Sequence, residues 1–141
     1  MTSTISPVVQ QILPMVRSIM ISDEQFATFN QNIDRKLTER AWTAKDANSQ
    51  PELDTIFLLY KKAIEDHKAN MQTQYDLGQK MFSKIETTED FALIPTFLHE
   101  FNVAIQPLLA VHKQLQTVIT QLEGRIIPLL PPGTRLTNEI L

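Results

Sequence analysis

The fold is decided by residues 50–86, which read QPELDTIFLLYKKAIEDHKANMQTQYDLGQKMFSKIE. Mostly apolar side chains recur in this stretch at alternating intervals of three and four residues. This spacing places them along one side of an α-helix, as in the seam of a coiled coil. We therefore predict one long helix over residues 50–86, with its charged residues in solvent. The seam comprises Phe57, Tyr60, Ile64, His67, Met71, Gln74, Gly78, Met81 and Ile85.

A second long helix is predicted over residues 88–124. The segment begins with a threonine and acidic residues, which favour a helix start, and Gly124 is typical of a helix end. Because only a short link separates the two long helices, they should pack as an antiparallel hairpin. The buried stripe of the second helix comprises Leu98, Phe101, Ile105, Leu108, His112, Leu115, Ile119, Leu122 and, if the helix continues past Gly124, Ile126.

Two shorter helices are predicted over residues 6–20 and 22–46. The second starts with a capping box, in which Ser22 and Gln25 satisfy backbone donors of the first turn. A hairpin covers only one face of each of its helices, so the remaining apolar residues need further cover. We therefore expect an all-α protein, an antiparallel four-helix bundle that forms a single domain over residues 1–124.

Residues 125–141 are predicted to form an extended, Pro-rich and apolar tail. Its prolines favour an extended course. Its isoleucines and leucines need cover, which the bundle itself or a partner protein could supply.

Composition excludes several classes of function. The chain of 141 residues has no cysteine and a net charge of −3. Nucleic-acid modules carry a basic stripe, whereas the densest basic cluster here, Arg35, Lys36 and Arg40, is interrupted by Glu39 and is interpreted as a solvated helix face. No window has the ~20 apolar residues of a membrane span. With no signal-peptide pattern either, we expect a cytoplasmic protein, and signal-independent secretion stays open.

No motif with a catalytic mechanism is present in the sequence. It has no glycine-rich phosphate loop and no nucleophile elbow, and adjacent carboxylates diverge around a helix. We therefore expect a non-enzymatic protein without a cofactor. One alternative is a ligand- or metal-binding bundle that uses His67 and His112, which face each other across the predicted hairpin. A metal site needs three or four ligands, so a polar layer that sets the helix register is the other interpretation.

The helix over residues 88–124 is unusually poor in charge. From Phe91 to Leu122 its only charged side chains are Glu100 and Lys113. Interface cores are depleted of charged residues, so we predict that this helix and the tail bind a partner, either a second copy or another protein. A helix at the centre of the bundle would have the same composition. The predicted contact residues are Gln106, Lys113, Gln114, Thr117, Gln121, Ile127, Leu129 and Leu130. The expected function is that of a subunit or adaptor.

Overall fold

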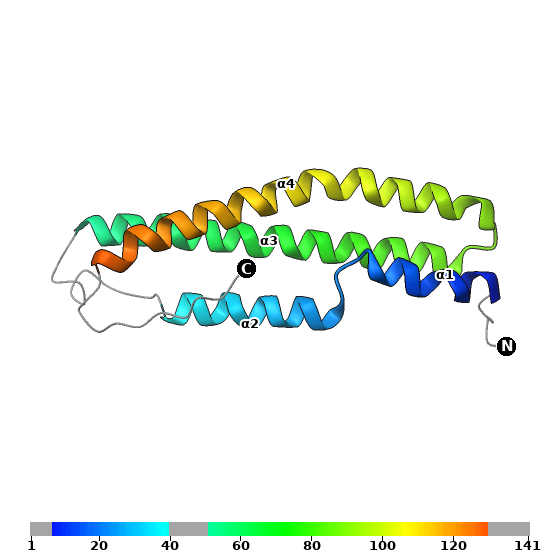
Figure 1. Ribbon diagram of the computed structural model, residues 1–141, viewed down its shortest axis with the longest axis horizontal. Coiled ribbons are helices and arrows are strands. Elements are labelled where there is room, and N and C mark those ends of the chain that lie inside the picture. Colours follow the sequence, from blue (N-terminus) through cyan, green and yellow to red (C-terminus); the bar gives the residue numbers. More distant parts are fainter. Residues whose placement is uncertain (1–6, 40–50, 130–141) are drawn as a thin grey trace.

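The protein is all-α, as predicted. The computed structural model describes residues 7–39 and 51–129, which form helices joined by short links (Figure 1). The elements are α1 (Pro7–Ser18), α2 (Asp23–Glu39), α3 (Pro51–Thr87), η1 (Phe91–Leu93), α4 (Ile94–Ile126) and η2 (Ile127–Leu129). None of the helices formed by these described residues is long and apolar enough to cross a membrane.

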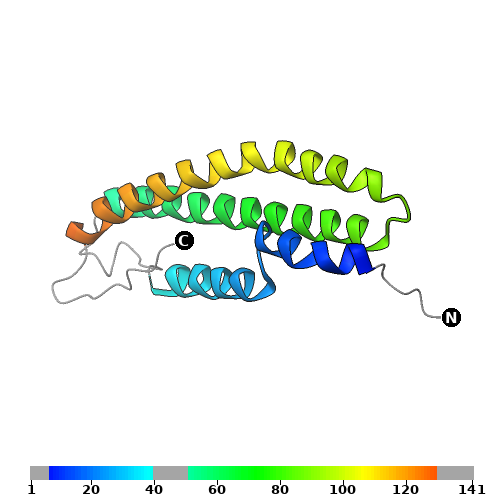
Figure 2. The ribbon, with the colours of Figure 1, turned by 45° about the vertical axis from the view of Figure 1, so that its right-hand side comes forward.

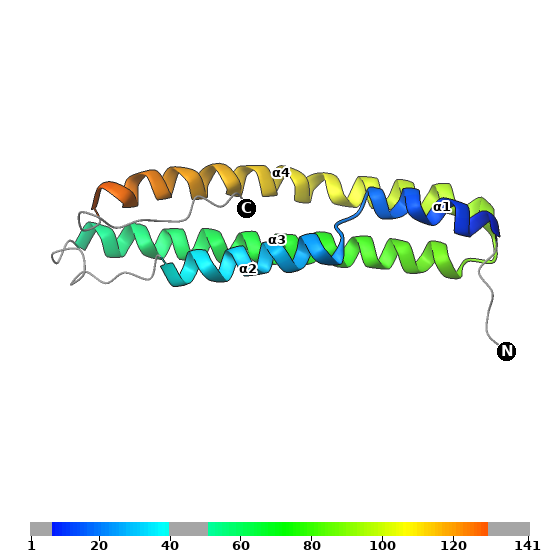
Figure 3. The same cartoon turned by 60° about the horizontal axis from the view of Figure 1, so that its bottom comes forward.

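The two long helices form the predicted antiparallel hairpin. α3 and α4 run side by side along nearly their whole length and are joined by the short helix η1 (Figures 1 and 3). Asp90 caps η1, since its carboxylate accepts a hydrogen bond of 3.0 Å from the backbone N–H of Ala92. Pro95 lies in the first turn of α4, where its missing N–H costs nothing. α4 then continues through Pro107 with a gentle bow (Figure 1).

The two short helices lie end to end along α3, which differs from the predicted bundle (Figures 1, 2 and 3). A cross-section therefore contains three helices instead of four, and the third is broken between α1 and α2. The break arises because Ser22 starts a new helix. Its Oγ accepts from Gln25 N at 3.1 Å, and its own N–H donates to Gln25 Oε1 at 3.0 Å. The predicted capping box is thereby confirmed.

The core consists of two apolar clusters, one beneath each short helix. We call the region around α1 the α1 half and the region around α2 the α2 half. The α1-half cluster comprises Val9, Leu13, Val16, Met81, Ile85, Ile94, Phe101 and Ile105. The α2-half cluster comprises Phe29, Ile33, Ile56, Tyr60, Ala63, Ile64, Ile119, Leu122 and Ile126. α1 and α2 pack mainly against α3, which also contacts α4 along the hairpin.

Some predicted boundaries change. Gly124 does not end the last helix, because Ile126 is fully buried in the α2-half cluster and its burial favours one more turn. Residues 125–126 of the predicted tail are therefore helical, and 3₁₀ structure follows. Residues 40–50 lie outside the described residues, as do residues 130–141, so the predicted end of the second helix and most of the tail lie there too.

The three–four spacing of the sequence predicts Val9, Ile12, Val16 and Ile19 as the buried stripe of α1, and the structure differs from this pattern in part. Val9 and Val16 are buried as expected, but Leu13 is buried as well and Ile19 is 50% exposed. The reason is that α1 ends at Ser18, so Ile19 lies in the link and no longer follows the helical period.

Candidate functional site

One side of α4 is turned away from α3, and we call it the outer face. The five residues predicted there as partner contacts are all exposed: Gln106, Lys113, Gln114, Thr117 and Gln121. Apolar side chains accompany them. Val103 is 56% exposed, and Val111 and Val118 are about equally exposed at 41% and 40%. The outer face is thus a long, mixed apolar and amide surface.

The predicted contact residues beyond α4 are only partly described. Ile127 is half exposed in η2. Leu129 closes η2, but its side chain lies outside the described part of the chain, and so does Leu130.

Charge separates α4 from α3. Among the residues of α3 from position 54 onward, the exposed charged side chains are Asp54, Lys61, Lys62, Glu65, Asp66, Lys68, Asp76, Lys80 and Lys84. Between residues 94 and 122, α4 exposes only Glu100 and Lys113. Glu100 lies 3.7 Å from Lys84, so one of these two charges is directed toward the neighbouring helix of the hairpin. The outer face of α4 is therefore almost neutral.

A groove opens at the break between α1 and α2. Its volume is about 380 Å³, and it lies between the link, α2, α3 and α4. Ile19, Ile21, Ile105 and Leu109 are among the apolar residues of its wall. Its amide side chains are Gln25, Gln74, Asn102 and Gln106. None of the described residues that line it is charged.

A buried polar layer crosses the hairpin at the level of the break. The side chains of His67, Asn70 and Gln74 on α3 are 0%, 8% and 3% exposed. Gln74 Nε2 donates to Asn70 Oδ1 at 2.5 Å and lies 3.4 Å from His112 Nδ1 of α4. The ring centroids of His67 and His112 are 4.5 Å apart, so the predicted proximity of the two histidines is confirmed. The layer separates the two apolar clusters.

Burial lowers the pKa of His112, which therefore stays neutral near pH 7. No group of three or more His, Cys, Asp or Glu side chains within residues 7–39 and 51–129 is arranged to hold a metal ion.

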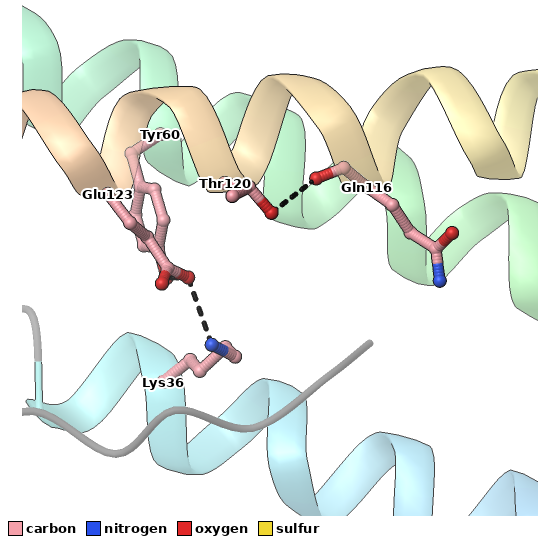
Figure 4. A network of polar contacts seen from close by, with 5 residues as sticks. All are labelled: Lys36, Tyr60, Gln116, Thr120 and Glu123. Atoms are coloured by element: carbon pink, nitrogen blue, oxygen red, sulfur yellow. Dashed lines mark hydrogen bonds and ion pairs between the residues drawn. The ribbon is translucent and has the colours of Figure 1, made fainter.

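A second polar network ties three helices together (Figure 4). Lys36 of α2 donates to Glu123 Oε1 of α4 at 2.9 Å, and the Tyr60 hydroxyl of α3 donates to the same oxygen at 3.0 Å. Lys36 is only 2% exposed, so its assignment to a solvated face was wrong. One turn before Glu123, Thr120 Oγ1 donates to the backbone oxygen of Gln116 at 2.9 Å. The Glu123 carboxylate reaches Lys36 because α2 lies beside α4. The periodicity of the α2 sequence could not predict this pairing, because it contains no information about α4.

The start of α2 is also anchored to α3. The Tyr75 hydroxyl donates to Asp23 Oδ1, and this hydrogen bond to a carboxylate raises the pKa of the Tyr75 phenol. The ring of Phe26 packs edge-on against the Tyr75 ring, with centroids 4.3 Å apart. These contacts hold α2 beside α3 just after the break.

Comparison with known proteins gives no match: no family model fits the sequence, and no curated protein or solved structure matches the chain. The candidate sites therefore depend on their own geometry. Sequence reasoning had identified the outer face and the histidine pair. It missed Asn70, Glu123 and the groove. The one available signal was the run of polar residues in the seam of α3, where His67 is followed by Gln74.

Proposed function

We propose that this protein is a non-enzymatic interaction module that binds a partner protein through the outer face of α4. The observation that carries the proposal is the exposure of a nearly neutral helix face. Solvated helices normally carry many charges, as α3 does, whereas interface cores are depleted of them. Val103, Thr117 and Gln121 are exposed on this face.

The position of α4 in the bundle supports the proposal. Low charge could have indicated a helix at the centre of the bundle, but α1 and α2 pack mainly against α3 and leave the outer face of α4 exposed. α4 is ~50 Å long at about 1.5 Å per residue. A partner that follows the helix could bury about 800 Å² on this side, which is typical of a specific interface. The partner is either a second copy of the chain or a different protein, and it brings a surface that is itself poor in charge.

Site-specific photo-crosslinking in cells that express the full chain tests the proposal. The photoreactive residue p-benzoylphenylalanine is placed at position 103 or 117 on the outer face. We expect one covalent adduct of defined mass from both positions, since both would lie within the interface. The matched controls are exposed positions on α3, Lys62 and Gln72, which should give no adduct.

The proposal fails if positions 103 and 117 give no adduct, or if the α3 positions give the same one. The mass of the adduct identifies the kind of partner. An adduct of twice 16.1 kDa indicates self-association, and any other mass indicates a different protein. Light scattering over a concentration series then checks the first outcome in the purified chain.

A further inference from the structure

The groove at the break between α1 and α2 has no role in the proposed interaction. We propose that it binds an uncharged, mainly apolar small molecule that donates a hydrogen bond, such as an alcohol or a phenol. The groove lies on the side of α4 that is turned toward α1 and α2, and of its described lining residues only Gln106, at the edge, also belongs to the outer face.

The size and chemistry of the groove indicate this class of ligand. Its volume of about 380 Å³ falls within the ~300–1,000 Å³ of small-molecule sites. Phe101, Ile105 and Leu109 supply apolar surface from α4, and Ile19 and Ile21 supply it from the link. A charged ligand would lose its hydration without gaining an opposite charge from the described lining. The lining therefore favours an uncharged molecule.

Gln74 supplies the polar group within the groove. It is only 3% exposed, and burying an amide in an apolar core lowers stability unless hydrogen bonds compensate. Its Nε2 donates to Asn70 Oδ1 at 2.5 Å and lies 3.4 Å from His112 Nδ1. This arrangement leaves the Gln74 carbonyl to accept a hydrogen bond. A hydroxyl group of the ligand is a suitable donor.

The coincidence of the break and the polar layer adds a second argument. A layer that only sets helix register needs buried polar residues, but it needs neither an interrupted third helix nor a groove at the same level. Here α1 ends at Ser18 and α2 begins at Asp23, beside the amide of Gln74. Departures from apolar packing of this kind concentrate at functional sites.

Three probes built on the same naphthalene ring test the inference on the full chain by isothermal titration calorimetry. They are β-naphthol, its methyl ether and naphthalene sulfonate. We expect β-naphthol to bind saturably at one site. The methyl ether should bind roughly tenfold more weakly, because it cannot donate the hydrogen bond. The sulfonate should bind more weakly than both. Absence of saturable binding of β-naphthol, or equal binding of all three probes, overturns the inference.

Variants locate the site. Gln74→Leu removes the acceptor, so the roughly tenfold preference for β-naphthol over its ether should disappear. Leu109→Lys places a charge on the groove wall and should weaken the binding of β-naphthol at least tenfold, as measured by the same titration. Leu59→Lys on α3 is the matched control, because Leu59 is also an exposed leucine (53% against 44% for Leu109) but lines neither the groove nor the outer face of α4. Equal affinities of the two lysine variants would place the binding elsewhere and overturn the inference. The probe comparison on the unmodified chain holds even if Gln74→Leu does not fold.

Discussion

The α1 half and the α2 half of the molecule share the same two long helices but are held together differently. In the α1 half, the buried side chains that the structure describes are apolar, with Val16 and Ile85 essentially inaccessible. The α2 half has a cluster of similar size, and in addition a buried lysine paired with a glutamate and a tyrosine. The α1 half is thus stabilised by apolar packing, whereas the α2 half is stabilised by apolar packing together with the buried network of Lys36, Tyr60 and Glu123.

The difference teaches how register is set in a bundle with a broken helix. Apolar burial is non-directional, so a short helix such as α1 gains nearly the same free energy in neighbouring positions. A buried ammonium group costs several kcal/mol unless its partner is in place. The ion pair of Lys36 and Glu123 therefore favours a single position of α2 along α4, the one in which the two side chains meet. The following four predictions test or sharpen this comparison.

The largest effect is expected from Glu123→Gln. The substitution leaves the Lys36 ammonium buried without its counter-charge, and breaking such a pair costs about 3–5 kcal/mol. Urea denaturation gives the free energy of unfolding. The control is Asp66→Asn, which breaks the pair of Lys62 and Asp66, similar in length at 3.0 Å but exposed. It should cost less than ~1 kcal/mol, and equal losses for both variants would show that burial of the first pair is unimportant.

Truncation of the apolar clusters should have the next largest effect. Ile85→Ala in the α1 half and Ile64→Ala in the α2 half each remove a fully buried side chain of α3. We expect a loss of about 2–5 kcal/mol for each. If the α1 half is packed as tightly as the α2 half, the losses in free energy of unfolding for the two variants should agree within ~1 kcal/mol. A much smaller loss for Ile85→Ala would mean that α1 covers α3 loosely.

A smaller effect, of opposite sign, is expected at the helical glycines. A Cβ added at Gly124 would meet nothing within 4 Å, so Gly124→Ala should raise the free energy of unfolding by about 0.5–1 kcal/mol. A Cβ at Gly78 would lie 3.0 Å from Met20 Cβ, beside the break. Gly78→Ala should therefore give no gain. Thermal unfolding of both variants measures the difference, and a gain at Gly78 would show that the link is not packed against α3.

The smallest effect concerns the polar layer between the halves. The pKa of His112 in the folded chain is lowered from its ordinary value of 6.5. Below about pH 6.5 the unfolded chain therefore binds more protons than the folded chain, and the free energy of unfolding should fall as the pH falls. His112→Gln should reduce this slope in a pH series of urea denaturations. His99→Gln, at an exposed position, is the control. If both variants keep the full slope, the prediction is wrong and a group other than His112 is responsible for it.

Local patterns were sufficient for much of the fold. The three–four spacing correctly predicted α3 and α4, because helical period depends only on neighbours along the chain. The capping box at Ser22 correctly predicted the start of α2. Prediction failed where distant segments compete for the same residue. Gly124 continues a helix because Ile126 is buried, and Lys36 is buried because Glu123, 87 residues away, lies opposite it.

The candidate sites show the same division. The charge-poor character of α4 is a property of composition, so the sequence could indicate an outer face. The groove could not be predicted, because it depends on where the link between α1 and α2 lies relative to Gln74 and Leu109. The wall of the groove is made by side chains of the link, α2, α3 and α4, and no regular spacing in the sequence relates these elements to one another.

By itself, the sequence determined that this protein is helical, where its two long helices lie, and that they pair as a hairpin with His67 and His112 at one level. The tertiary structure alone decided that α1 and α2 lie end to end, that both pack mainly against α3, and that a buried charged network stabilises the α2 half. The physical reason is that helix formation and amphipathicity are local properties of the chain. The choice of neighbours instead depends on which surfaces remain to be covered once the hairpin has formed.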